Sequence, residues 1–191
     1  AERLLGCACK VATSLDESGR IIQQGTFNDI SYGELDGSDS DRLAAVHTFM
    51  RDAGFDANIS NTILRDMWEK WTLLAAMGSI NCLMRGSIGE VVAAAGGHEF
   101  ALRMIDEVSA VVRAAGQELS EPFLTQAYRL LTLQGSPQTS SMYRDLVAGR
   151  AIEADQIIGD LLVRASAKDM EAPLLALVYA HLLVYQARLD N

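Results

Sequence analysis

The sequence predicts a mainly α-helical protein, a helical bundle with a small antiparallel β layer at its N-terminal end. Residues 60–191 carry apolar side chains at helical spacing, interrupted by helix-capping residues and glycines. Residues 1–59 instead contain short runs with β-branched residues, separated by turn residues. Because 49% of the 191 residues are hydrophobic, the chain can bury a substantial core. We therefore expect two domains, 1–59 and 60–191.

The N-terminal domain is expected to be a thin layer. Antiparallel strands are expected at residues 4–15, 20–25 and 29–35, followed by a helix at 40–53 and a short strand at 55–59. One helix cannot cover a sheet of this size. We therefore expect this region to be the end of a larger domain.

The C-terminal domain is expected to be entirely helical. Its helices are expected at 62–85, 88–95, 98–115, 121–133, from 140 to a break at Gly149, 152–168 and 173–188. The first is long and apolar on nearly all sides, which predicts a central, buried position. Ser87 with Glu90 forms the sequence pattern of a capping box, and Ser120 is a cap for the fourth helix.

Charge and cysteine usage restrict the partners and the compartment. The formal charge of −9 argues against nucleic acid or an anionic membrane as the main partner, and apolar runs are shorter than the ~20 residues of a membrane span. The opening AERLLG lacks the features of a signal peptide. Cys7, Cys9 and Cys82 lack metal-ligand spacing, so we expect reduced thiols in the cytoplasm, with Cys7 and Cys9 packed on one strand face.

Two short blocks in the helical region contain polar residues that need an explanation. The first runs from Ser140-Ser141-Met142 to Glu153 and Gly159, and Glu153 falls at the margin of an apolar face. A carboxylate there is costly unless it is paired or solvated, although a helix-start glutamate also complements the helix dipole. The second block is MWEKW, in which Lys70 stands between two tryptophans. On residue type alone, Lys70 fits a surface lysine beside Glu69.

Together these blocks resemble the signature of the ketopantoate reductases (2-dehydropantoate 2-reductases), whose C-terminal domain carries a lysine helix followed by SSM-x-x-D and Glu-x-Asp-x-Ile-x-Gly. The resemblance covers essentially the whole chain. It implies a C-terminal helical bundle of the 6-phosphogluconate dehydrogenase type, preceded in 1–59 by the tail of a Rossmann domain. No GxGxxG occurs in the sequence, so the resemblance also implies that the nucleotide-binding domain is truncated here and that this chain alone is inactive.

The resemblance assigns roles to individual residues. Lys70 corresponds to the family's general acid, which polarises the substrate carbonyl and protonates it as hydride arrives from NADPH. Glu153 corresponds to the carboxylate beside that lysine and the nicotinamide ribose. Ser141 corresponds to the serine that binds the substrate carboxylate, whereas Ser140 is either a second contact or the helix cap. The implied reaction is the reduction of a 2-oxo acid, in the family's case within pantothenate biosynthesis.

One departure from the family pattern concerns substrate choice. Ketopantoate-specific members carry asparagines four and eight residues after the lysine, where this sequence has Leu74 and Gly78. We assign the nearby Ser79 and Asn81 to other helix faces. A site that lacks two amide groups loses the polar pairs on which such specificity depends. We therefore expect a different, more apolar 2-oxo acid or ketone.

A second class of function stays open, in which the chain is a non-catalytic helical module for interaction or dimerisation. The apolar stretch 174–185 is either core or a dimer face. The oligomeric state stays open, although the uncovered strands of 1–59 favour a homodimer. The remaining polar residues have plain explanations: histidines without metal spacing, ion-paired arginines and a surface glutamate. These residues are His47, His98, His181, Arg144, Arg150 and Glu107.

Overall fold

The computed structural model describes residues 3–189 and divides the chain into two compact units. The first unit ends at Met67 and the second begins at Trp68. This boundary falls inside helix α2 (Ile63–Met84), slightly later in the chain than the division expected from the sequence. The protein is mainly helical with a small N-terminal sheet, which confirms the predicted fold class.

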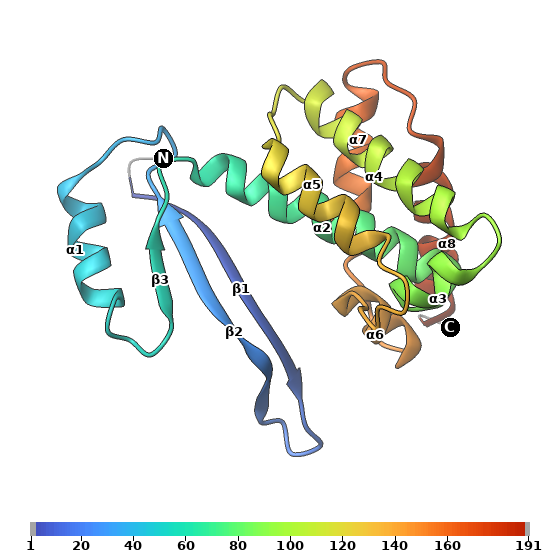
Figure 1. Cartoon of the computed structure of the whole chain (residues 1–191), viewed down its shortest axis with the longest axis horizontal. Helices are drawn as coiled ribbons and strands as arrows, with labels where there is room; N and C mark the ends of the chain where they lie inside the picture. The colour runs from blue at the N-terminus through green and yellow to red at the C-terminus, as the bar shows by residue number, and fades with distance from the viewer. Residues whose placement is uncertain (1–2, 190–191) are drawn as a thin grey trace. The chain divides into compact units, whose positions relative to one another are not determined.

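The first unit contains a three-stranded sheet in the order β1-β2-β3 (Figure 1). Strand β1 (Gly6–Leu15) pairs antiparallel with β2 (Ile21–Gly33), as expected. Strand β3 (Asp56–Ile59) follows helix α1 (Asp41–Met50) and joins β2 in parallel, so the sheet is mixed.

The prediction of separate strands at 20–25 and 29–35 is wrong, because both belong to β2. The pairing register shifts between Val11 and Thr13, whose partners on β2 are Asn28 and Gln23. Strand β2 has more residues than β1 across this shift, which forms a β-bulge, and Gly25 supplies the positive φ of 80° within it. The turn-like composition around Gly25 therefore marks an irregularity inside one strand.

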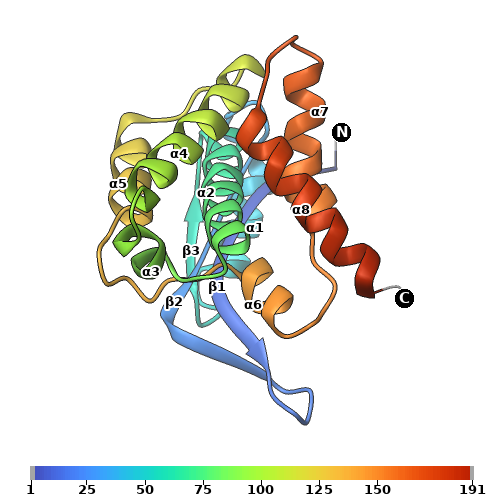
Figure 2. The same ribbon diagram turned by 90° about the vertical axis from the view of Figure 1, so that its right-hand side faces the viewer.

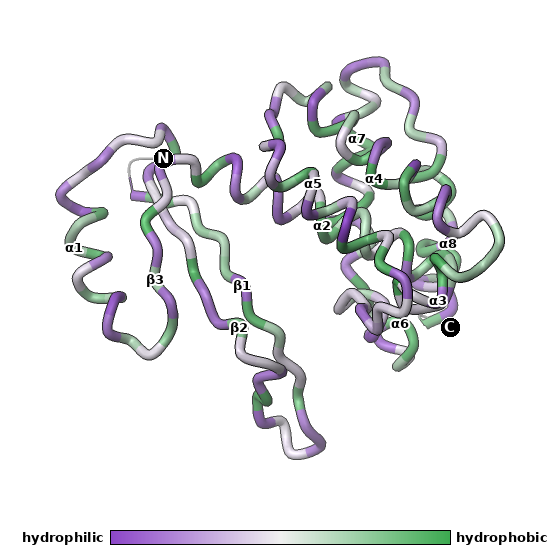
Figure 3. The backbone as a smooth tube through the Cα atoms, in the orientation of Figure 1, coloured by the Kyte–Doolittle hydropathy of each residue, from purple (hydrophilic) through white to green (hydrophobic). Residues whose placement is uncertain are grey.

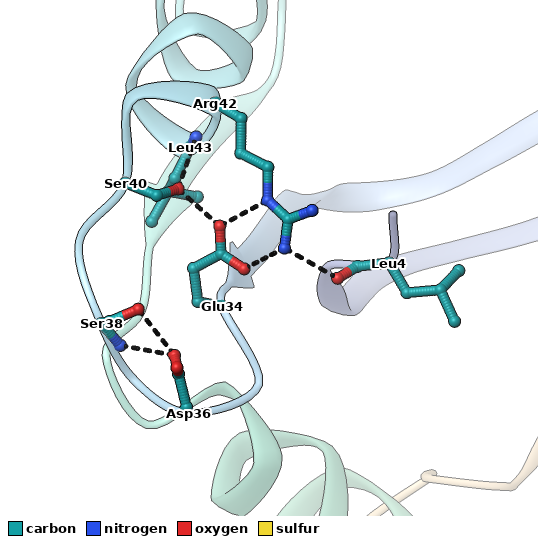
Figure 4. Close-up of polar contacts among 7 residues, drawn as sticks. All are labelled: Leu4, Glu34, Asp36, Ser38, Ser40, Arg42 and Leu43. Carbon is teal, nitrogen blue, oxygen red and sulfur yellow. Dashed lines mark hydrogen bonds and ion pairs between the residues drawn. The ribbon is translucent and has the colours of Figure 1, made fainter. Parts of the chain in front are cut away.

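A buried carboxylate joins the end of β2 to the start of α1 (Figure 4). Glu34 accepts hydrogen bonds from Ser40 Oγ at 2.5 Å and from Arg42 Nε at 2.7 Å, and its side chain is only 8% exposed. Arg42 also donates to the Leu4 carbonyl. Ser40 caps α1 by accepting from Leu43 N at 3.1 Å. The hydrogen bonds from Arg42 and Ser40 lower the pKa of Glu34 from 4.5 to about 2.

Large apolar side chains are exposed on this unit, and apolar and hydrophilic residues alternate along the β1–β2 hairpin (Figure 3). Leu15, Ile21 and Phe27 are 70%, 74% and 64% exposed. The expected packing of Cys7 and Cys9 is wrong, since both are exposed. Alternation along β1 turns the small residues Gly6 and Ala8 to the covered face instead.

The second unit is a helical bundle in which other helices surround the later part of α2 (Figure 2). Ala75, Ala76, Ile80 and Cys82 of α2 are fully buried or nearly so, as predicted for a central helix. The other elements are α3 (Ile88–Ala93), α4 (Gly97–Ala114), α5 (Glu121–Leu131), α6 (Ser141–Val147), a π-helix η1 (Asp155–Gly159), α7 (Asp160–Ser166) and α8 (Pro173–Leu189). Over residues 3–189, no helix is both long and apolar enough to cross a membrane.

Helix caps within this unit are partly local and partly supplied from distant segments. The capping box of Ser87 and Glu90 and the Ser120 cap are both present, as predicted. Glu107 on α4, expected to be a surface residue, is half-buried and has a structural contact: its carboxylate accepts from Leu175 N at 2.7 Å and from Leu174 N at 3.2 Å. It therefore caps α8, where free backbone N–H groups favour a negative charge.

Candidate active site

Lys70 lies half-buried on α2, in the same helical turn as two tryptophans. The rings of Trp68 and Trp71 stack with their centroids 5.0 Å apart. The guanidinium carbon of Arg164, on α7, lies 5.0 Å and 5.4 Å from these two ring centroids, within cation–π range. The carboxylate of Glu69 accepts from Ser120 N at 2.9 Å at the start of α5. Both chain neighbours of Lys70 are thus held in place by other helices.

Trp71 connects this lysine block to the second sequence block. Its Nε1 donates a hydrogen bond to the Ile157 carbonyl at 3.0 Å. Ile157 belongs to η1, which begins two residues after Glu153. The structure therefore brings together the immediate surroundings of two residues that the sequence separates widely.

The second block does not form the continuous α-helix expected from residue 152. Its first part is the π-helix η1, closed by the hydrogen bond from Asp160 N to the Asp155 carbonyl. Tyr179 of α8 donates to Asp155 Oδ1 at 2.7 Å, and a Cβ on Gly159 would lie 3.2 Å from the Tyr179 ring. Single π turns inside helices occur frequently at functional sites.

Glu153 stands at the start of this helical segment. Its carbonyl accepts from Ile157 N at 3.0 Å, and the residue is exposed. The carboxylate is therefore solvated, so the desolvation cost anticipated from the sequence does not arise.

The two serines of the first block differ in exposure. Ser140 is buried and caps α6, with Oγ accepting from Tyr143 N at 3.1 Å. Ser141 is the first residue of α6 and is exposed. The cap interpretation of Ser140 is therefore confirmed, and the Ser141 hydroxyl is the one open to a ligand.

Gly78 and Asn81 of α2 both face this serine segment. A Cβ on Gly78 would lie 2.6 Å from Met142 Cε and 3.9 Å from Ser140 Oγ, so Met142 fills the space beside Gly78. Asn81 Oδ1 accepts a hydrogen bond from Ser140 N at 2.8 Å. The assignment of Asn81 to a different face is thus wrong, because three residues are nearly one helical turn. The signal in the sequence is an asparagine one helical turn after Gly78.

The other predicted polar residues have structural contacts. Arg150 forms an ion pair with Asp145 at 2.6 Å, as expected, whereas Arg144 donates to the Thr139 carbonyl at 2.8 Å. Burial and the Arg85 charge lower the pKa of His181.

His47 shares a hydrogen bond of 2.9 Å with the Tyr32 hydroxyl in the first unit. His98 is exposed near the start of α4.

Comparison with known proteins identifies the family. The family model described as "Ketopantoate reductase PanE/ApbA C terminal" matches residues 62–186. This match covers more than half of the chain, and the protein belongs to the ketopantoate reductase family.

Two curated relatives extend over most of the chain. An oxidoreductase of Bacillus subtilis, YkpB, described as uncharacterized, is 29% identical over 97% of this chain and 61% of its own length. The 2-dehydropantoate 2-reductase of Archaeoglobus fulgidus is 29% identical over 84% of this chain and 53% of its own length. The chain therefore spans little more than half the length of these relatives.

Solved structures share the fold at low sequence identity. A PanE/ApbA family ketopantoate reductase from Ralstonia eutropha matches with a TM-score of 0.85 and 20% identity, over 98% of this chain and 60% of that one. D-mandelate dehydrogenase, solved with NADH and anilino(oxo)acetate, matches with a TM-score of 0.78 and 17% identity. The match covers 96% of this chain and 60% of that one.

Proposed function

We propose that this chain is the substrate-binding part of an NADPH-dependent oxidoreductase that reduces a 2-oxo acid or a related ketone. The observation that supports this most is the hydrogen bond from Trp71 Nε1 to the Ile157 carbonyl. It ties the helix turn that carries Lys70 to the segment that begins at Glu153. In the family, these two segments carry the general acid and its partner carboxylate.

In the proposed reaction, each residue has a separate task. A reduced nicotinamide cofactor supplies the hydride that adds to the substrate carbonyl carbon. The Lys70 ammonium group donates a hydrogen bond to the carbonyl oxygen and then transfers its proton there. Glu153 keeps the ammonium group charged and oriented, and Ser141 donates its hydroxyl hydrogen to the substrate carboxylate.

The chain's own residues fit only one end of such a cofactor. The exposed carboxylate of Glu153 can accept hydrogen bonds from ribose hydroxyls, whereas the sequence contains no glycine-rich loop for the pyrophosphate. Binding of the whole cofactor therefore requires a nucleotide-binding domain in addition to this chain. As part of the same proposal, the enzyme acts in the cytoplasm, where the exposed thiols of Cys7 and Cys9 stay reduced.

The substrate is proposed to be more apolar than ketopantoate. The positions of the two family asparagines are occupied by Leu74 and by Gly78, and Met142 fills the space beside Gly78. An aliphatic wall binds a hydrocarbon side chain and leaves the hydroxyl of ketopantoate unpaired. The ligand in the D-mandelate dehydrogenase structure, anilino(oxo)acetate, is a 2-oxo acid with an aromatic substituent, which suits the same chemistry.

The test is a panel of 2-oxo acids offered to the full-length gene product with NADPH and, separately, with NADH. We expect oxidation of NADPH with branched or aromatic 2-oxo acids and a much lower kcat/KM for ketopantoate. Turnover of ketopantoate as good as that of the apolar acids would contradict the substrate proposal. A full-length protein that neither binds NADPH nor reduces any 2-oxo acid would favour the interaction module instead.

A further inference from the structure

The C-terminal end of α2 is closed by the side chain of Asn81. The helix ends at Met84; Arg85 then adopts the left-handed conformation with a φ of 57°, and the buried Gly86 follows. Asn81 Nδ2 donates to the Gly86 carbonyl at 2.8 Å, while Gly86 N donates to the Asn81 carbonyl at 3.3 Å. Asn81 is fully buried, so these groups have no access to water.

The other end of the same amide reaches the serine segment. Asn81 Oδ1 accepts from Ser140 N at 2.8 Å, and Ser140 is itself buried. Asn81 thus bridges two backbone groups, one in the turn after α2 and one immediately before Ser141. Only a side chain with both a donor and an acceptor can satisfy the two, since aspartate lacks the donor and alanine lacks both.

The segment on either side of Ser140 is anchored as well. The loop before Ser140 accepts two hydrogen bonds from α3. Ile88 N donates to the Gln138 carbonyl at 3.0 Å, and Gly89 N donates to the Ser136 carbonyl at 2.9 Å. After Ser140, the Tyr143 hydroxyl donates to the Arg85 carbonyl at 2.9 Å. Asn81 supplies the buried contact between these two anchors, directly beside Ser141.

Lys70 and Asn81 lie about three turns apart on α2, which places them on the same side of the helix. We propose that Asn81 is a positioning residue that fixes Ser141, and with it the substrate carboxylate, relative to Lys70 on the same helix. This inference rests on the proposed function. Asn81 does not touch the substrate, and it acts through the backbone of Ser140.

The test compares Asn81→Asp and Asn81→Ala with wild type in the full-length protein. Asn58→Asp is the matched control, because Asn58 is exposed on β3 in the other unit. Substrates are the best 2-oxo acid of the panel and its methyl ester, which lacks the carboxylate. Misplacing Ser141 should raise KM for the acid by about tenfold or more, with a smaller fall in kcat and an unchanged KM for NADPH.

For the methyl ester we expect a KM close to that of wild type in every variant. Deuterium exchange of the peptide that contains Ser140 N should be faster in both Asn81 variants and unchanged in Asn58→Asp. Thermal unfolding shows whether each variant is folded. If Asn81→Ala does not fold, Asn81→Asp supplies the comparison with wild type.

Two outcomes would overturn the inference: equal losses for acid and ester, or wild-type KM for the acid together with faster exchange at Ser140. These outcomes differ from a failure of the proposed function, in which wild type itself would reduce no 2-oxo acid.

Discussion

Single carboxylates have structural tasks in this protein that their sequence context does not reveal. Glu34 binds Ser40 and Arg42, Glu69 binds the Ser120 amide, and Glu107 caps α8. The last two partners lie far away in the sequence, so no local pattern predicts them. From the sequence alone, each of these glutamates would be interpreted as a solvated surface charge. In the folded protein, each one instead accepts hydrogen bonds from other segments.

The Glu34 contact predicts a pH dependence of stability. Its pKa is lowered to about 2 in the folded protein, so the charged form is favoured by folding. The stabilisation is fully present above about pH 4.5, the ordinary value of a glutamate, and is lost as the pH falls towards 2. Glu34→Gln should therefore lower the midpoint of thermal unfolding at neutral pH and lose this effect near pH 2.

Thermal unfolding across this pH range checks the expectation, with Glu17→Gln as the control because Glu17 is exposed in the β1–β2 turn. A difference between Glu34→Gln and wild type that persists unchanged at pH 2 would show that the ionised carboxylate is not responsible.

At the scale of elements, the sequence predicts the helices well and the irregular elements poorly. Caps such as Ser87 and Ser120 act within one turn, so local sequence is sufficient to find them. The π-helix η1 contacts Tyr179 from α8, and β2 pairs with β1 along its length, so both elements have partners that local sequence does not reveal. Both candidate blocks are visible in the sequence, but the Trp71 hydrogen bond that joins them depends on tertiary packing.

The loop before α6 packs directly on α3, which gives a prediction for Gly89. A Cβ at Gly89 would lie 2.5 Å from Ser136 N and 2.7 Å from the Gly135 carbonyl carbon, so backbone would have to move. Gly89→Ala should destabilise the protein by about 2 kcal/mol or more, which is within the range for overpacking. Urea unfolding measures the change.

Gly86→Ala is the matched control, because its Cβ would meet Glu90 Cβ at an ordinary 3.4 Å. Equal stability of the two variants would contradict the close packing of the loop on α3.

At the scale of the whole molecule, α8 has one face in the core and one face exposed. Leu175, Val178 and Leu182 are fully buried, whereas Leu177 and Val184 are 57% and 53% exposed. The buried face is part of the core, and the exposed residues are those available for the dimer face that the sequence leaves as an alternative. Leu177→Glu should shift the full-length protein from dimer to monomer.

Sedimentation equilibrium checks this, and Ser166→Glu, exposed at the end of α7, is the control. A monomeric wild type, or a dimer that Leu177→Glu leaves intact, would exclude this surface.

The proposed role of Lys70 as the general acid of a reductase is tested by NADPH oxidation with the full-length protein carrying Lys70→Ala. Lys168→Ala is the matched control, since Lys168 is an exposed lysine in the same unit. We expect Lys70→Ala to lower kcat by about 10²-fold or more, as for loss of a general acid, and Lys168→Ala to leave it unchanged. Comparable kcat values for Lys70→Ala and wild type would exclude Lys70 as the general acid.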